Sequence, residues 1–267
     1  MALNLGANAI GKLYLGSTQI NKAYLGATVV FSGGSFDPTS LFAASQQGLL
    51  YEAFDIDTLF QDSAGTTPVT VAGQPVGLML DKSGNGNHAT QATAAKRPTY
   101  TTGSGLAWLA FDGVDDELVT QSNINVSGNS AREYIGGSGP GGPVLTFNSG
   151  GDIGERWTVR EDNGNMRVEI AGSAYVSGLS SDGVVGVRLP GGGTLGDHVL
   201  SNGTTDENAS GSDIVNTGIG QLYIGQLNNN TWKNAEFYGC TFINKLLTAQ
   251  QRGDARQYYA EKRGVVL

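Results

Sequence analysis

Cysteine, charged residues and long apolar runs are all scarce in this sequence of 267 residues. The only cysteine, Cys240, excludes an intrachain disulfide and a metal site built from several cysteines. It lies in an apolar stretch, which predicts a buried small side chain rather than a nucleophile. No stretch approaches the ~18 apolar residues of a membrane span, and no basic region followed by an apolar one opens the chain. We therefore expect folding in the cytosol and no insertion into a membrane.

Charged residues make up only 15% of the chain, and the net charge is −8. Nucleic-acid binding depends on Lys and Arg that neutralise phosphates, so nucleic acid is not an expected partner. Glycine supplies 41 residues, which is about twice its average usage. Abundant glycine with few charged side chains favours strands and turns over amphipathic helices. The composition therefore predicts an all-β protein.

A near-repeat of ten residues opens the chain and ends at Phe31. Residues 10–19 and 20–29 agree at six of ten positions, and each copy places an alternating run before a glycine that can adopt positive φ. This pattern predicts a strand-turn-strand ladder that is too short to bury a core alone. Residues 32–35 form a flexible break, so we expect an N-terminal segment over residues 1–34 and a second domain over residues 35–267.

Short alternating runs separated by turn residues follow one another in the second domain. They comprise residues 48–54, 76–80, 106–111, 117–119, 156–159, 166–170, 184–189, 198–200 and 221–224. Their spacing predicts two packed antiparallel sheets. Residues 121–151 are rich in Gly, Ser and Asn, which predicts a long exposed loop. One helix is expected near the C-terminus, because Thr248 and Gln251 form a capping-box pair and Gly264 suits a terminator.

Four motifs in this domain resemble the laminin-G-like, concanavalin A-like jelly rolls of tailed-phage virion proteins. They are residues 81–88 (DKSGNGNH), 97–100 (RPTY), 111–116 (FDGVDD) and 237–243 (FYGCTFI). The resemblance covers about residues 41–267 and implies an all-β, concanavalin A-like jelly-roll sandwich with one C-terminal helix. The Tyr-Leu-Gly repeats before it are similar to the leader segments of phage tail and fibre proteins. They imply a segment that fixes the protein to the particle.

The resemblance implies a virion structural protein, a tail fibre or spike that presents a lectin-like domain to the host surface. Such a protein is located on the virion and binds a host surface polysaccharide. The resemblance implies no cofactor. Other virion proteins are the expected partners of the N-terminal segment, in a homo-oligomer that is a trimer by analogy with such fibres. The anchoring or oligomer contacts fall on the apolar repeat residues Leu13, Tyr14, Leu15, Tyr24 and Leu25. A decoration or assembly protein that binds only virion proteins is an alternative.

Sugar recognition uses aromatic faces beside amides and carboxylates, because sugar C–H patches pack on rings while hydroxyls need fixed hydrogen-bond partners. Four aromatic residues close to Gly-, Ser- or Asn-rich turns are candidates: Trp232, Trp157, Tyr134 and Tyr175. Trp232 follows an Asn-rich run and is the best candidate for an exposed ring. For Trp157 and Tyr175 the alternative is that they are core residues of strands.

Acidic residues at two places raise the question of catalysis or metal binding. Retaining glycosidases with this fold have a motif similar to Glu-x-Asp-x-x-Glu, in which alternate residues point to one face of a strand. Here Glu52 and Asp55 are three positions apart, so a regular strand would point their side chains to opposite faces. We therefore expect no enzyme, and a polysaccharide-degrading glycosidase is a second alternative. Asp112, Asp115 and Asp116 are weak calcium candidates, since a hairpin turn explains them better and no loop has the ligand spacing of a known calcium motif. The sequence favours no metal and offers no histidine motif.

Overall fold

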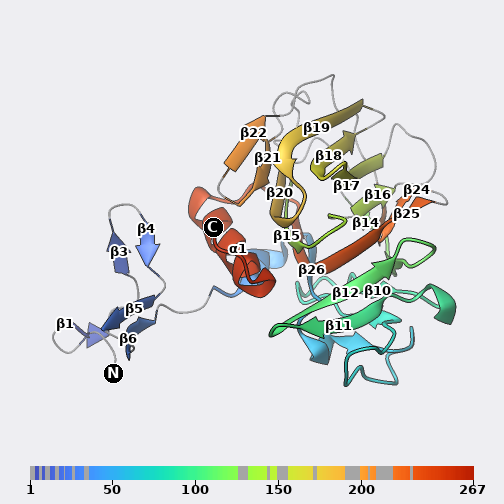
Figure 1. The fold of residues 1–267 in the computed structure, drawn as a ribbon, viewed down its shortest axis with the longest axis horizontal. Helices are drawn as coiled ribbons and strands as arrows, with labels where there is room; N and C mark the ends of the chain where they lie inside the picture. Colours follow the sequence, from blue (N-terminus) through green and yellow to red (C-terminus); the bar gives the residue numbers. More distant parts are fainter. Residues whose placement is uncertain are drawn as a thin grey trace. The chain divides into compact units, whose positions relative to one another are not determined.

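The structure, a computed structural model, divides into two compact units, Met1–Asp37 and Pro38–Leu267. Figure 1 shows both units. The residues that it describes are 4–5, 8–9, 13–15, 18–20, 22–25, 28–32, 36–125, 132–142, 145–148, 156–170, 173–189, 199–203, 205–208, 219–228 and 231–267. No helix among them is long and apolar enough to cross a membrane.

Three β-hairpins make up the described part of the N-terminal unit. They pair β1 (Asn4–Leu5) with β2 (Asn8–Ala9), β3 (Leu13–Leu15) with β4 (Thr18–Ile20), and β5 (Lys22–Leu25) with β6 (Thr28–Ser32). Each hairpin corresponds to one copy of the sequence repeat, which confirms the predicted strand-turn-strand pattern. The innermost pairs enclose two residues that begin with glycine, as in Leu15↔Thr18, and this sequence favours tight hairpin turns. The described strands form three separate two-stranded sheets.

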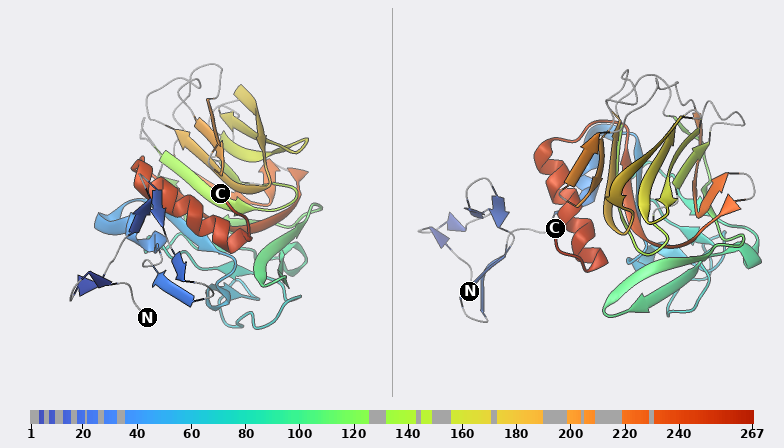
Figure 2. Two further views of the ribbon diagram at one scale, coloured as in Figure 1. Left: turned by 60° about the vertical axis from the view of Figure 1, so that its left-hand side comes forward. Right: turned by 45° about the horizontal axis from the view of Figure 1, so that its top comes forward.

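Two antiparallel sheets form the second unit (Figures 1 and 2). One sheet has the order β19-β18-β17-β16-β23-β13-β10-β9-β8, with β14 beside β23. Its strands are β8 (Leu59–Phe60), β9 (Leu78–Met79), β10 (Ala89–Thr90), β13 (Leu118–Thr120), β14 (Ile124–Asn125), β16 (Leu145–Asn148), β17 (Arg156–Asp162), β18 (Asn165–Ile170), β19 (Ser173–Ser180) and β23 (Ile219–Ile224).

The other sheet has the order β11-β12-β26-β15-β20-β21-β22, with β7 beside β26. Its strands are β7 (Gly48–Glu52), β11 (Thr99–Gly103), β12 (Leu106–Asp112), β15 (Arg132–Ser138), β20 (Gly183–Leu189), β21 (Val199–Asn202), β22 (Thr205–Asn208) and β26 (Asn234–Ile243). The second unit also contains a separate small hairpin of β24 (Gln226–Asn228) and β25 (Thr231–Trp232). Its short helices are η1 (Pro38–Ser45), η2 (Ile56–Thr58) and η3 (Ala94–Lys96). The C-terminal helix is α1 (Ala249–Arg263).

The core lies between the two sheets, where alternate residues of facing strands meet. Leu145 and Phe147 of β16 and Leu222 and Ile224 of β23 enter it from one sheet, and Tyr51 of β7 enters it from the other. Alternation with period two is what places these side chains on one face of each strand. The predicted two-sheet sandwich with one C-terminal helix is confirmed, and Cys240 is buried as expected.

The prediction of a long exposed loop over residues 121–151 is wrong for the residues that form strands, 124–125, 132–138 and 145–148, whereas residues 121–123 are exposed outside any strand. β15 crosses the middle of a sheet, between β26 and β20, and residues 133–139 are buried. Gly136 is required there, because a Cβ on it would lie 2.8 Å from the carbonyl oxygen of Gly239 and would collide with the Tyr134 hydroxyl. Close approach of neighbouring strands, rather than a turn, explains this glycine.

Helix α1 has the capping box predicted at its start and ends at Gly264, whose φ is 72°. A buried carboxylate holds the helix to the sandwich. Glu133, only 2% exposed, accepts hydrogen bonds from the Arg252 guanidinium, one of them of 2.9 Å, and from the backbone N–H of Leu247. Because both oxygens of this buried carboxylate are bonded, the pair fixes the first turns of α1.

The motif at residues 81–88 folds around the Asp81 carboxylate. Its oxygens accept backbone N–H groups of Leu50, Ser83 and Asn87, each at 2.9 Å. His88 contributes Nδ1 as acceptor of the Asp81 N–H at 2.9 Å. This motif therefore stabilises a loop against β7, and His88 takes part in it as a hydrogen-bond acceptor.

Candidate functional site

A hairpin at the margin of the sandwich carries Trp232, the candidate that sequence reasoning ranked first for exposure. β24 and β25 pair through Gln226↔Trp232 and lie on the side of the sandwich away from α1 (Figures 1 and 2). Gly225 separates this hairpin from β23 and has a φ of 92°. A Cβ on Gly225 would collide with the Phe111 ring and lie 2.6 Å from the Asp116 carbonyl oxygen. Glycine therefore lets the chain leave the sheet at this point.

The Trp232 side chain is half-buried, and its indole N–H lacks an acceptor among the described residues. Its indole Nε1 is buried and has no hydrogen-bond partner among the described residues. The Lys96 ammonium, at the end of η3, lies over the ring at 5.5 Å from its centroid. A buried donor without a partner is costly, typically about 1–3 kcal/mol. Such a donor points to a position where an acceptor from outside the chain is useful.

Glu117, which is bonded to Lys96 through the backbone, has a carboxylate oxygen that lacks a hydrogen-bond donor among the described residues. Its backbone N–H donates to the Lys96 carbonyl at 3.1 Å, which joins the two segments. One carboxylate oxygen, Oε1, accepts from the Gln91 side chain at 3.3 Å, whereas Oε2 is buried without a partner in the described part of the chain. Burial raises the pKa of the nearby Tyr223, and the Glu117 charge acts in the same direction. We call Trp232, Lys96 and Glu117 the hairpin patch.

The three calcium candidates lie next to this hairpin, since Asp112 pairs with Asn234 two residues after Trp232. Oxygens of Asp112, Asp115 and Asp116 lie within 4.8 Å of one another. Burial raises the pKa of Asp116 to about 6, and the charges of Asp112 and Asp115 act in the same direction. Asp112 Oδ1 accepts the backbone N–H of Val114 at 2.8 Å. The arrangement is that of a hydrogen-bonded turn, and calcium binding stays untested.

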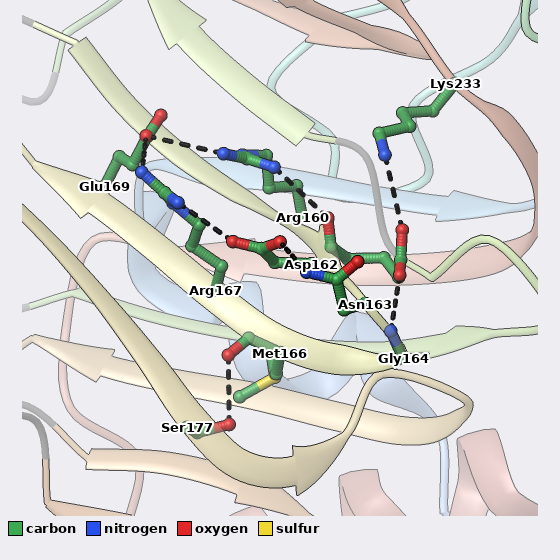
Figure 3. A network of polar contacts seen from close by, with 10 residues as sticks. Arg160, Asp162, Asn163, Gly164, Met166, Arg167, Glu169, Ser177 and Lys233 are labelled. Atoms are coloured by element: carbon green, nitrogen blue, oxygen red, sulfur yellow. Dashed lines mark hydrogen bonds and ion pairs between the residues drawn. The ribbon is translucent and has the colours of Figure 1, made fainter.

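A charged network on β17 and β18 reaches Lys233, the residue after Trp232 (Figure 3). Lys233, directly after Trp232, lies 3.3 Å from Glu161 of β17. On β17 and β18, Arg167 forms ion pairs with Asp162 at 2.9 Å and with Glu169 at 2.5 Å. A hydrogen bond from Arg167 lowers the pKa of Asp162. These charges neutralise one another, so we regard the network as support for the hairpin rather than as a site.

The other predicted aromatic residues do not join Trp232. Tyr134 is 1% exposed and belongs to the core, so its ring is not available to a sugar at the surface. Tyr175 of β19 is half-buried, and its hydroxyl donates to the Glu207 carboxylate of β22, which raises the pKa of Tyr175 to about 12. Trp157 pairs with Phe147 in the ladder, and its side chain lies outside the described part of the chain.

The carboxylates considered for catalysis lie together, contrary to the expectation from strand geometry. β7 ends at Glu52, and the chain then turns before Asp55. The Lys82 ammonium reaches both carboxylates, at 2.5 Å from Glu52 and 2.6 Å from Asp55. Burial lowers the pKa of Lys82, but its bonds to Asp55 and Glu52 outweigh this and raise it. The Tyr258 hydroxyl donates to the other oxygen of Glu52, which is 3% exposed.

The residues predicted to anchor the chain lie in the N-terminal hairpins. Leu13, Tyr14 and Leu15 form β3, and Tyr24 and Leu25 belong to β5. Their role in anchoring or oligomerisation stays a prediction.

No protein-family model and no curated protein sequence matches the chain. Its fold is similar to that of solved arabinofuranosidases. One is an arabinofuranosidase complexed with arabinofuranosyl-α-1,2-xylobiose, with a TM-score of 0.56 and 12% identity, over 85% of this chain and 65% of that one. Another is a GH54 α-L-arabinofuranosidase soaked with a cyclic sulfate inhibitor, with a TM-score of 0.55 and 14% identity. This match covers 85% of this chain and 66% of that one. The chain thus spans slightly less than two thirds of these enzymes, and the likeness concerns the fold.

Lys96 and Glu117 were missed by sequence reasoning. Each directly adjoins a motif that carried the resemblance, Lys96 before residues 97–100 and Glu117 after residues 111–116. That adjacency is the only signal the sequence offers, because neither residue belongs to a motif of its own. Lys96 meets Trp232 of β25 only in the folded chain, and Glu117 is joined to Lys96 by a backbone hydrogen bond.

Proposed function

We propose that this chain is a virion structural protein of a tailed phage, whose sandwich binds a surface polysaccharide at the hairpin patch. The observation that carries the binding proposal is the half-buried Trp232 ring on the marginal hairpin, with the Lys96 ammonium over it. A sugar suits this arrangement, because its C–H face packs on an aromatic ring while its polar groups need hydrogen-bond partners.

The fold agrees with this proposal without requiring it. Concanavalin A-like sandwiches serve binding, structural and hydrolytic roles, so fold likeness alone does not assign a ligand. One solved arabinofuranosidase of similar fold is complexed with a xylobiose derivative. We extend the class of ligand, a polysaccharide, to this chain only as part of the proposal.

We propose binding without catalysis. The strongest pair of carboxylates, Glu52 and Asp55, is held by the Lys82 ammonium, and Glu52 is almost fully buried. A retaining glycosidase needs one carboxylate free to attack the sugar and another free to donate a proton. Glu52 instead accepts from both Lys82 and Tyr258, which favours a structural role.

We propose that the N-terminal unit attaches the protein to other virion proteins, in a homo-oligomer located on the particle. Two-stranded hairpins are marginally stable alone in water. The three described hairpins of this unit do not pair with one another, so partner strands from an assembly would stabilise them. The motif resemblance of the sandwich to phage virion proteins supports the same location.

Glycan-array binding by the full chain tests the binding proposal. Trp232→Ala should reduce binding at least tenfold, whereas Trp108→Ala should leave it unchanged. Trp108 is a matched control, because it is another half-buried indole, stacked on Tyr238 of β26 at 5.6 Å. Absence of glycan binding by the wild type would contradict the proposal and favour a decoration or assembly protein.

A further inference from the structure

The lysine over Trp232 distinguishes the hairpin patch from an ordinary sugar platform. Its ammonium lies 5.5 Å from the ring centroid and so covers part of the face on which a sugar would stack. Lys96 forms no ion pair with a described residue. By contrast, Lys82 and Lys233 each reach a carboxylate. Lys96 is therefore a cation held over Trp232 without an ion pair to any described residue.

We propose, on the basis of the proposed function, that the hairpin patch selects a sugar residue that carries a carboxylate. The sugar ring packs on Trp232, and its carboxylate pairs with the Lys96 ammonium. The sugar carboxylate thus supplies the ion-pair partner that Lys96 lacks among the described residues.

The energetics favour an acidic sugar over a neutral one. A neutral sugar that stacks on Trp232 displaces the ammonium from the ring and so loses the cation–π contact. An acidic sugar gives the displaced ammonium a carboxylate instead, and hydrogen bonds between two charged groups are about twice as strong as neutral ones. The same lysine therefore opposes a neutral ligand and favours an acidic one.

The surrounding charges limit the ligand to isolated acidic sugars rather than a dense polyanion. The chain carries a net charge of −8, and the carboxylates of Glu117, Asp112 and Asp115 lie on segments beside the hairpin. A single carboxylate can pair with Lys96, because its ammonium offers one positive charge over the Trp232 ring. A chain of closely spaced anions would meet the acidic loop as well.

Two disaccharides of the same linkage, one ending in glucuronate and the other in glucose, test the inference by titration calorimetry with the full chain. The wild type should bind the glucuronate-terminated disaccharide at least tenfold more tightly. Lys96→Gln should abolish this preference, with affinity for the glucuronate-terminated disaccharide falling at least tenfold. Lys262→Gln is the matched control, because Lys262 also lies over aromatic rings, at 4.9 Å from Phe54 and 5.4 Å from Tyr258.

The outcomes separate this inference from the proposed function. Equal affinity of the wild type for both disaccharides, with binding lost in Trp232→Ala, would overturn the acidic preference and keep polysaccharide binding. A preference that survives in Lys96→Gln would also overturn it, since the lysine would then not be the selecting group. No binding of either disaccharide, together with an empty glycan array, would overturn both. Thermal melting of each variant verifies that it is folded.

Discussion

The hairpin patch and the junction of β7 with α1 contain similar groups but differ in how many of them have partners. Each has a lysine over an aromatic ring and a carboxylate nearby. At the junction, Glu52 accepts from Lys82 and Tyr258, and Lys82 also reaches Asp55. At the hairpin patch, the Trp232 N–H and Glu117 Oε2 have no partner among the described residues. Residue types alone therefore do not distinguish a structural cluster from a binding site.

The difference has a physical meaning for stability. Saturated polar groups contribute to folding, because removal of one partner leaves the other buried and unpaired. Unpartnered buried groups oppose folding and so are more informative about ligands. The two regions should therefore respond in opposite ways to comparable substitutions.

The largest expected effect is at the junction. Glu52→Ala removes the acceptor of the Tyr258 hydroxyl and one of the two carboxylates at Lys82. We expect a loss of about 2–4 kcal/mol in the free energy of unfolding, because Glu52 is buried. Urea denaturation measures this loss, and glycan binding should persist wherever the variant is folded. An unchanged denaturation midpoint would show that the cluster does not support the fold.

A smaller and opposite pair of effects comes from removing one donor from an aromatic ring in each region. Tyr258→Phe deletes the hydroxyl bonded to Glu52 and should lower the free energy of unfolding by about 1–2 kcal/mol without affecting glycan binding. Trp232→Phe deletes an indole N–H that has no partner in the described chain. Its stability should equal or exceed that of the wild type, while glycan affinity falls about tenfold. Thermal melts and titrations on both variants make the comparison, and destabilisation of both would refute it.

Much of the sandwich followed from the sequence, because period-two alternation reports directly on which face is buried. β18 (residues 165–170) and β23 (residues 219–224) were predicted within a few residues. The stretch containing β15 was not, since glycine also marks close strand approach, and only the neighbours of Gly136 reveal that role.

The candidate site was less accessible from sequence. Trp232 was identified from its Asn-rich neighbours, whereas Lys96 comes from another segment and meets it only in the folded chain, where Glu117 bonds to Lys96. Glu52 and Asp55 were assigned to opposite faces on the assumption of a continuous strand, but β7 ends at Glu52. Whether a buried atom has a partner depends on three-dimensional contacts, which no local pattern encodes.

The smallest expected effect concerns Tyr175, which resembles the junction rather than the hairpin patch because its hydroxyl is bonded to Glu207. This bond raises the pKa of Tyr175 to about 12 in the folded chain, compared with about 10 in the unfolded chain. The raised pKa means that the neutral hydroxyl stabilises the fold below pH 10, and this contribution is lost as the pH rises towards 12.

Tyr175→Phe should therefore lower stability slightly at neutral pH and flatten the decline in stability between pH 10 and 12. Urea denaturation at a series of pH values measures both changes. Part of the decline should remain in the variant, because burial also raises the pKa of Tyr238 to about 12. Identical pH profiles for the variant and the wild type would show that the Tyr175 hydroxyl does not join β19 to β22, and the edge of the sandwich would then depend on backbone contacts such as the bond from the Gly178 N–H to Glu207 at 2.9 Å.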